Sequence, residues 1–226
     1  MKIFCIICTR SNDLNNVTKK LLDTLSSFSI HTKLLVNQKS IFEAYDKGLK
    51  SCDANPEDIV IFCHDDVLIF DEKEVFLTKL LKCQHNNVGI IGPAGTTYLG
   101  QDAVWWNHAN WAKGKHKGLV YHVTEDGKLN PTEYGPSGKV VALDGLFLAA
   151  RKEVWDAIGL EKPEYFEGNW DFYDIHYTTK SHLLGYNNYA LGFKIIHQSS
   201  GEVAGRDSWH KNREAFINNT KLPLTC

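Results

Sequence analysis

Two adjacent aspartates, Asp65 and Asp66, stand where a long apolar run of the sequence ends. The run, 59–63, leads into His64 and is typical of a strand that is buried on both faces of a parallel sheet. Neighbouring carboxylates at such a place repel each other and lose hydration, and a divalent cation would relieve both costs. Mg²⁺ and Mn²⁺ take carboxylate oxygens and are commonly shared with substrate phosphates. The pair is therefore a candidate metal site, and a solvated acidic turn is the alternative.

Other predicted strands also end in polar groups. These groups are Thr9, Arg10 and Ser11 after the strand 3–8, Asp144 and Gly145 after the strand 139–143, and His197 after the strand 189–196. In open α/β sheets, ligands bind beyond the carboxyl ends of the strands. The sequence therefore predicts a cluster of carboxylates, imidazoles and an arginine at one sheet edge, which suits a metal-bound diphosphate. Polar loops are common at any sheet edge, so chance clustering is the alternative.

The elements that must position these groups alternate along the first 95 residues. Apolar runs predict strands, and apolar residues at helical spacing predict helices, so the pattern indicates a mostly parallel central sheet flanked by helices. The expected strands are 3–8, 31–36, 59–63 and 88–91, and the expected helices are 14–27, one that Ser40 and Glu43 begin as a capping box, and 72–84 with Val75, Phe76, Leu80 and Leu81 as its apolar positions. Neither a GxGxxG fingerprint nor a P-loop pattern is present.

Residues 96–138 differ in character, because aromatic residues and histidines mix there without a clear period. We expect a long, partly irregular insertion over the cleft, since long loops in compact domains are usually functional. Trp105, Trp106 and Trp111 are candidates for stacking on the C–H faces of sugar rings. The alternative is that these tryptophans only pack the insertion against the rest of the protein.

The composition indicates a globular protein. The chain has 226 residues, 43% of them apolar, and a formal net charge of -2, which argues against a broad electrostatic grip on nucleic acid. Cys5 and Cys8 form a CxxC inside an apolar run, without a second such pair, so we expect buried reduced thiols. No apolar stretch reaches the roughly 18–20 residues of a membrane span, and no signal peptide is visible after Met1. These features predict a cytoplasmic protein.

Four stretches of the sequence, taken in order, resemble the nucleotide-sugar glycosyltransferases of the GT-A fold, specifically the small family-2-like group. They are SIFEAYDKGL (40–49), IFCHDDV (61–67), VGIIGPAG (88–95) with VALDGLFLAAR (141–151), and WDFYDIHYTTKSHLLG (170–185). The resemblance implies the α/β GT-A fold in a single domain over 1–226. That domain would comprise a nucleotide-binding half 1–95, an aromatic-rich insertion 96–138, an acceptor and catalytic half 139–200, and a tail 201–226.

The resemblance also implies roles for individual residues. The family's Asp-x-Asp metal element matches 64–66, where a histidine replaces the first aspartate, and the implied ligands of Mn²⁺ or Mg²⁺ are Asp66, His64 and His197. The implied nucleotide-sugar-binding residues are Thr9, Arg10, Ser11, Asp65, Asp144 and Gly145. The implied acceptor-binding residues are Trp105, Trp106, Trp111 and Asp171.

Asp174 matches the family's catalytic base, and Asp144 is the second implied catalytic carboxylate. At about 100° per residue, Asp174 points away from the apolar face of the predicted helix 170–184, whose members are Phe172, Ile175, Thr179 and Leu183. A solvated surface aspartate is therefore the alternative for Asp174, and Asp171 is the alternative base.

The resemblance implies a metal-dependent, inverting hexosyltransferase that moves a sugar from a UDP- or GDP-sugar to a hydroxyl group of a glycan or glycoconjugate. Two other functions remain open. A nucleotidyltransferase would need a glycine-rich, basic loop after the first strand, and residues 8–11 contain no glycine. A non-catalytic carbohydrate-binding protein on a decayed transferase fold would bind glycans without binding nucleotides.

Overall fold

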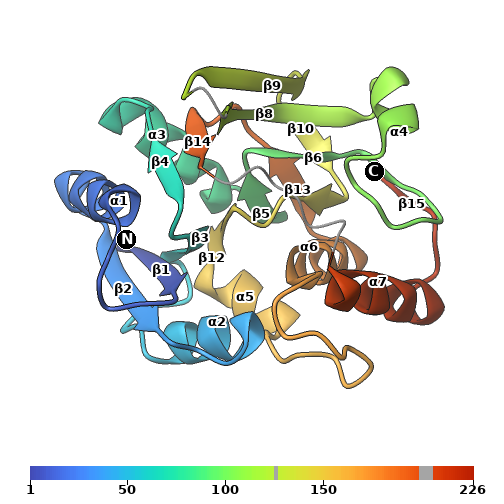
Figure 1. Cartoon of the computed structure of the whole chain (residues 1–226), viewed down its shortest axis with the longest axis horizontal. Helices are drawn as coiled ribbons and strands as arrows, with labels where there is room; N and C mark the ends of the chain where they lie inside the picture. Colours follow the sequence, from blue (N-terminus) through green and yellow to red (C-terminus); the bar gives the residue numbers. More distant parts are fainter. Residues whose placement is uncertain (125–126, 199–205) are drawn as a thin grey trace.

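The computed structural model describes residues 1–124, 127–198 and 206–226. The predicted boundary between the catalytic half and the tail, at residues 200 and 201, lies outside this part of the chain. Two sheets with helices around them form the described structure (Figure 1). A third, two-stranded sheet pairs β7 (Tyr98–Leu99) with β15 (Leu224–Thr225) and so attaches the C-terminal segment.

The central sheet has seven strands in the order β10-β13-β5-β12-β3-β1-β2. Five of them run in one direction, while β12 and β10 run the opposite way, so the predicted α/β class is confirmed and the sheet is mixed. The strands are β1 (Ile3–Thr9), β2 (His31–Val36), β3 (Ile59–His64), β5 (Val88–Gly92), β10 (Gly138–Val140), β12 (Phe147–Arg151) and β13 (Asn187–Ala190). The apolar run of β3 is fully buried, as its position inside the sheet requires.

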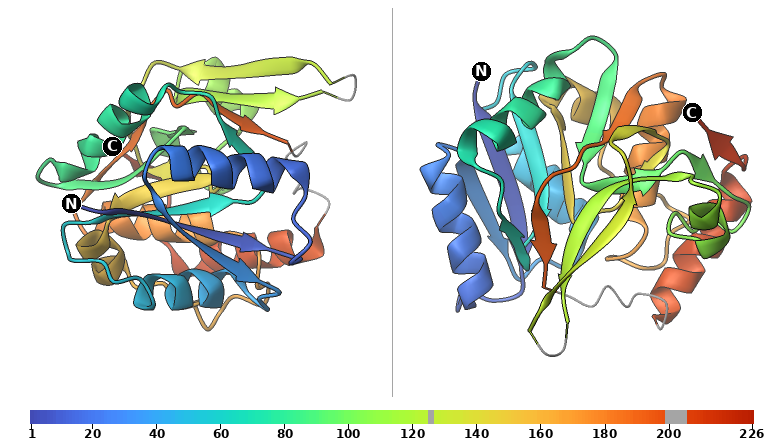
Figure 2. Two further views of the ribbon diagram at one scale, coloured as in Figure 1. Left: turned by 90° about the vertical axis from the view of Figure 1, so that its left-hand side faces the viewer. Right: turned by 90° about the horizontal axis from the view of Figure 1, so that it is seen from above.

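Helices cover both faces of this sheet. Three of them, α2 (Ile41–Lys50), α5 (Lys152–Ile158) and α6 (Tyr173–Leu183), lie along one face, and α1 (Asn16–Ser27) lies on the other (Figure 2). The opposite face also carries α3 (Lys73–Leu80), a 3₁₀ turn (Leu81–Gln84) and the second sheet, whereas α7 (Asp207–Asn219) packs outside α6 (Figure 1). None of the described helices combines the length and the apolar character that a membrane crossing requires.

The second sheet is built from continuations of strands of the first. The chain passes from one sheet to the other after β3, β5, β10 and β13, each time within one to four residues. The strands of the second sheet follow the order β11-β6-β8-β14-β4, with β9 paired to β8: β4 (Val67–Ile69), β6 (Ala94–Thr96), β8 (His116–Val123), β9 (Leu129–Gly135), β11 (Ala142–Leu143) and β14 (Ile195–His197). The chain therefore crosses from the first sheet into the second four times.

Two predictions about the second half of the chain were wrong. The expected strands 139–143 and 189–196 are each two strands, because the chain bends from one sheet into the other at residue 141 and over residues 191–194. Residues 96–138 contain the β8–β9 hairpin and α4 (His108–Ala112) beside irregular stretches, so part of the predicted insertion is regular. Its polar and aromatic residues hid the strand pattern because β9 is largely exposed and forms an edge of the sheet.

Some predicted helix features were also wrong. Val75 and Leu81 are 47% and 46% exposed, and Leu183 is 63% exposed: Val75 lies on the outer side of α3, Leu81 follows α3 in the 3₁₀ turn, and Leu183 is the last residue of α6. The capping box does not form, since the Ser40 hydroxyl donates to the carbonyl of Asn169 at 3.3 Å. That contact ties the start of α2 to the segment before α6.

An aromatic cluster in the core holds β3 in place. Tyr45 of α2 stacks on Phe62 with ring centroids 4.3 Å apart, and Trp155 of α5 contacts the same ring at 4.6 Å. The Trp155 indole donates to the carbonyl of Val60 at 3.0 Å. These contacts fix the strand whose last residue is His64.

We expect Phe62→Ala to lower the free energy of unfolding by about 3–5 kcal/mol, because it removes a buried ring and leaves a cavity between α2, α5 and the sheet. Urea denaturation would measure the loss. The control is Phe70→Ala, whose side chain is 57% exposed and whose effect should stay within about 0.5 kcal/mol. Equal losses in the two variants would contradict this description of the core.

Candidate active site

Three predicted metal ligands meet at the junction between the two sheets. His64 ends β3, Asp66 lies in the turn to β4, and His197 ends β14, which pairs with β4 so that His197 stands opposite Val67. Asp66 Oδ1 lies 3.4 Å from His197 Nε2 and 3.8 Å from His64 Nδ1. One nitrogen or oxygen of each residue lies within 4.8 Å of the others, which is compatible with a shared ion.

The Asp66 carboxylate has the character expected of a metal ligand. Its Oδ1 atom is buried and has no hydrogen bond of acceptable geometry, so it lacks the partner that a cation would supply. Burial alone would raise the pKa of Asp66, but the nearby imidazole of His197 lowers it, with a smaller effect from His64. Burial, followed by the charge of His197, lowers the pKa of His64 and favours the neutral imidazole that ligates metals. For His197, burial would lower the pKa, but Asp66 raises it.

A groove of about 950 Å³ runs from this triad along the end of β1. It is lined by the residues predicted to bind the nucleotide sugar, Thr9, Arg10, Ser11 and Asp65, and by residues that come just before α1. The Asn15 side chain caps α1 by accepting from the Thr18 amide, and the Thr18 hydroxyl donates to the carbonyl of Asp65 at 2.9 Å. The positive end of the α1 dipole therefore faces the same groove as the triad. Sequence reasoning missed Asn15, although its place before a helix is a recognisable N-cap signal.

Asp174 lies in a separate cavity of about 330 Å³ and is not a solvated surface residue. It is the second residue of α6, and its two carboxylate oxygens accept from the amides of Gly145 at 3.1 Å and Ile175 at 2.8 Å. Burial, aided by the charge of Asp144, raises the pKa of Asp174 to about 7. Asp144 and Gly145 follow β11 and line the same cavity. The turn after β11 and the first turn of α6 thus hold two carboxylates together.

Asp171 has a different environment from Asp174. Its carboxylate is buried and accepts from Arg206 Nη1 at 3.1 Å and from the Ser208 hydroxyl at 2.6 Å. These contacts attach the start of α7 to the segment before α6. The same residue borders the groove and the cavity, but its carboxylate is already held by two donors and is poorly placed to accept a proton.

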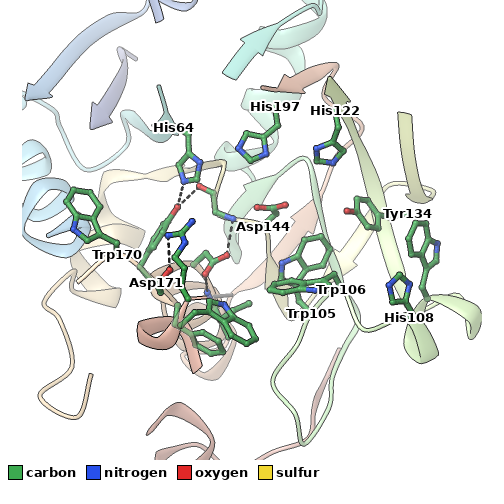
Figure 3. A pocket seen from close by; sticks show the side chains of 18 residues that line it. His64, Trp105, Trp106, His108, His122, Tyr134, Asp144, Trp170, Asp171 and His197 are labelled. Atoms are coloured by element: carbon green, nitrogen blue, oxygen red, sulfur yellow. Dashed lines mark hydrogen bonds and ion pairs between the residues drawn. The ribbon is translucent and has the colours of Figure 1, made fainter. Parts of the chain in front are cut away.

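Aromatic rings form most of the remaining cavity wall, as Figure 3 shows. Five of the six tryptophans of the chain line it: Trp105, Trp106, Trp111, Trp170 and Trp209. Trp105 is only 3% exposed and contacts Trp106 edge-on, so it supports the wall more than it faces the space. Trp170 is 42% exposed and borders both the groove and the cavity. Sequence reasoning missed Trp170, although it stands inside the stretch 170–185 that carried the resemblance.

His122 is a further residue that the sequence did not single out. Its ring lies 5.9 Å from that of His197, which in turn lies 5.8 Å from that of His64, so three imidazoles form a row beside Asp144 (Figure 3). The alternation of β8 explains its position, because β8 pairs with β14 and places His122 opposite His197.

Comparison with protein families gives this geometry a context. A family described as "Glycosyltransferase like family" matches residues 4–219. The chain belongs to this glycosyltransferase-like family. Both the description of this family and the fold described above agree with the GT-A fold that the sequence resemblance implied. None of the curated proteins compared with the chain matches it.

Solved structures similar to the chain match it at low sequence identity. GalNAc-T7 with UDP, GalNAc and Mn²⁺ superposes with a TM-score of 0.55 at 9% identity, covering 96% of this chain and 48% of that chain. The chain therefore spans about half the length of that relative. A197 from STIV aligns with a TM-score of 0.48 at 12% identity, covering 88% of this chain and 95% of that chain. A 4-diphosphocytidyl-2C-methyl-D-erythritol synthase from Anaerococcus prevotii reaches 0.43 at 13% identity, over 96% of this chain and 99% of that chain.

The raised pKa of Asp174 predicts a specific pH dependence of stability. The folded pKa of about 7 lies above the ordinary value of 3.8, so the folded protein holds a proton that unfolding releases, and stability falls as the pH rises toward 7. Asp174→Asn removes this loss. We expect the difference in unfolding free energy, variant minus wild type, to grow by about 2 kcal/mol between pH 5 and pH 8 in metal-free protein.

Urea denaturation at several pH values would measure this difference, because titrating groups that do not interact with Asp174 cancel in the comparison. Asp156→Asn is the control, because Asp156 is an exposed carboxylate that pairs with Lys152 on α5. A difference that stays constant with pH for Asp174→Asn would show that this carboxyl titrates normally in the folded protein.

Proposed function

We propose that the chain is a metal-dependent, inverting glycosyltransferase of the hexosyltransferase type. Its donor would be a UDP- or GDP-sugar, and its acceptor a hydroxyl group of a glycan or glycoconjugate. One observation carries the proposal: the groove and the cavity share a wall to which His64, His197 and Trp170 belong. A donor held in the groove and an acceptor held in the cavity would meet between the metal triad and Asp174.

The groove supports donor binding through several kinds of group. Thr9, Arg10 and Ser11 offer hydroxyls, amides and a positive charge to a nucleoside diphosphate, and the N-terminus of α1 adds its dipole. Asp65 can accept hydrogen bonds from the hydroxyls of a ribose. Asp144 and Gly145 stand on the cavity side, where the transferred sugar would lie.

The triad supports a divalent cation and favours one kind. When bound by Asp66, His64 and His197, such a cation supplies Lewis-acid stabilisation of the negative charge on the departing diphosphate. Two imidazoles and one carboxylate suit a transition-metal ion, whereas Mg²⁺ prefers oxygen ligands. We therefore propose Mn²⁺ ahead of Mg²⁺.

Asp174 is the proposed general base. Its carboxylate takes the proton of the acceptor hydroxyl while the hydroxyl oxygen bonds to the anomeric carbon of the donor sugar. The bond from that carbon to the diphosphate oxygen breaks, and its electron pair leaves with the nucleoside diphosphate. Attack opposite to the leaving group inverts the anomeric configuration, as in inverting hydrolysis. A pKa near 7 suits a base that works at neutral pH, and Asp144 contributes to it through its charge.

The aromatic cavity supports a saccharide acceptor. Trp106, Trp111 and the exposed Trp170 present ring faces of the kind that stack on sugars, while Trp105 supports them from behind. We further propose that the chain acts as one domain, with the donor groove mainly in 1–95 and the acceptor cavity mainly in 96–200. Six unpaired cysteines support a reducing compartment such as the cytoplasm.

Two substitutions separate metal binding from proton transfer. Asp66→Ala should abolish both Mn²⁺-dependent binding of the nucleotide and sugar transfer, because the proposed metal site loses the carboxylate that lies between its two imidazoles. Asp174→Asn should leave nucleotide binding unchanged and lower kcat by about 10²–10⁴-fold, since the amide cannot accept the proton. Transfer to a panel of glycans, followed by mass spectrometry, and calorimetry with the nucleotide would measure the two effects.

Asp46→Asn serves as the control, because Asp46 is a carboxylate of α2 that pairs with Lys50 away from the cavity. Sugar transfer at the wild-type rate by both Asp66→Ala and Asp174→Asn would refute the proposed function.

Trp170→Ala tests the acceptor wall. We expect the acceptor KM to rise about tenfold, because the variant loses a ring face worth about 1–1.5 kcal/mol, with a smaller change in the KM of the donor. Initial rates at varied acceptor concentration would show this. Tyr165→Ala is the matched control, since Tyr165 is a similarly exposed ring in the connector before α6 that borders neither space. An unchanged acceptor KM in Trp170→Ala would remove this tryptophan from the acceptor site.

A further inference from the structure

Tyr173 is a buried tyrosine whose hydroxyl reaches the metal triad. It is the first residue of α6, is 6% exposed, and packs edge-on against the rings of Phe42 and Tyr45. Its hydroxyl lies 2.6 Å from His64 Nε2 and 3.0 Å from the carbonyl oxygen of Gly145. Burial, with the neighbouring Tyr45, keeps its pKa well above the ordinary value, so the hydroxyl retains its proton.

The protons available to these groups allow one arrangement that satisfies every contact. The Gly145 carbonyl can only accept, so the single hydroxyl proton of Tyr173 must go to it. The phenolic oxygen is then the acceptor for His64, and Nε2 of His64 must carry a proton and donate it. The neutral imidazole holds one proton, so Nδ1 of His64 keeps a free lone pair. That atom is the one 3.8 Å from Asp66 Oδ1.

We infer that Tyr173 is a positioning residue that fixes His64 in the Nε2–H tautomer, so that Nδ1 is presented to the cation held by Asp66 and His197. The inference rests on the proposed function, because it assigns a role within the proposed metal site. A metal-ligating histidine generally donates its other ring N–H to an oxygen that fixes its tautomer and orientation. Here that oxygen is a phenol on α6.

The same hydroxyl also couples the metal site to the proposed base. Gly145 is held on both sides, because its carbonyl accepts from Tyr173 and its amide donates to Asp174, which is the next residue of α6. The fit is close, since a Cβ atom on Gly145 would lie 2.5 Å from the Tyr173 oxygen and 2.8 Å from the Asp174 Cβ. The first turn of α6 therefore sets the positions of His64, of the turn after β11, and of Asp174 together.

Tyr173→Phe tests the inference, with Tyr177→Phe as its matched control. Tyr177 lies one turn further along α6, is fully buried, and donates to the carbonyl of Leu160 at 2.8 Å without contacting the triad. Both variants lose one buried hydroxyl. Calorimetric titration with Mn²⁺ should show affinity about 10–100-fold lower in Tyr173→Phe and unchanged in Tyr177→Phe. Thermal melting would establish that both variants are folded.

A second readout needs no metal. In protein labelled with ¹⁵N histidine, NMR should show His64 protonated on Nε2 in the wild type and in Tyr177→Phe, and in a mixture of tautomers in Tyr173→Phe. A second pair of variants keeps the test independent of Tyr173: His64→Asn retains a polar atom near the position of Nδ1, and His64→Gln retains one near Nε2. We expect His64→Asn to keep more of the Mn²⁺ affinity than His64→Gln.

The outcomes separate the inference from the proposed function. Wild-type affinity for Mn²⁺ in Tyr173→Phe, a wild-type His64 protonated on Nδ1, or the reverse order of the two His64 variants would overturn the inference alone. A wild-type protein that binds no Mn²⁺ would overturn the proposed metal site and the inference with it.

Discussion

The described structure depends on one costly arrangement, a half-buried aspartate between two imidazoles. Its Oδ1 atom is buried without a hydrogen bond of good geometry, and His197 and His64 approach it at 3.4 and 3.8 Å. A carboxylate in this position destabilises the protein unless a positive charge lies beside it. The fold brings the three residues together because the chain crosses repeatedly from the central sheet into the second sheet, and both β4 and β14 begin or end at that junction. The architecture therefore brings these three residues together as a candidate cation site.

The start of α6 supplies the second constraint. Tyr173 and Asp174 stand next to each other and hydrogen-bond to the carbonyl and to the amide of the same residue, Gly145. The two side chains have different surroundings. Tyr173 contacts the His64 imidazole of the triad, and Asp174 lines the cavity that also contains the carboxylate of Asp144. Desolvation explains both environments: it keeps the phenol protonated and raises the pKa of Asp174 into the neutral range. A few residues thus control the electrostatics at both ends of the site.

The sequence predicted the groups of the site better than the elements that carry them. Apolar runs ending in polar residues correctly marked the ends of β1 and β3, because a buried strand must finish where charge begins. The break after Val140 was not predictable from pattern, since the chain stays apolar while it changes sheets, whereas the break after Ala190 falls in a segment that contains Gly192 and Lys194. The position of Asp174 was ambiguous for a similar reason. Helical periodicity ranks the faces of one helix, whereas the cavity is formed by the turn at Gly145, which lies 29 residues earlier.

The central claim is that a nucleotide and a cation bind together at the sheet junction. Thermal unfolding with UDP-, GDP-, CMP- and dTDP-sugars, each with Mn²⁺ and with a chelator, tests it most directly. We expect one nucleotide sugar to raise the free energy of unfolding only when Mn²⁺ is present, by about 2.7 kcal/mol at a hundred times its Kd. Stabilisation by free glycans, with none from any nucleotide sugar in either condition, would contradict the account and indicate a carbohydrate-binding protein.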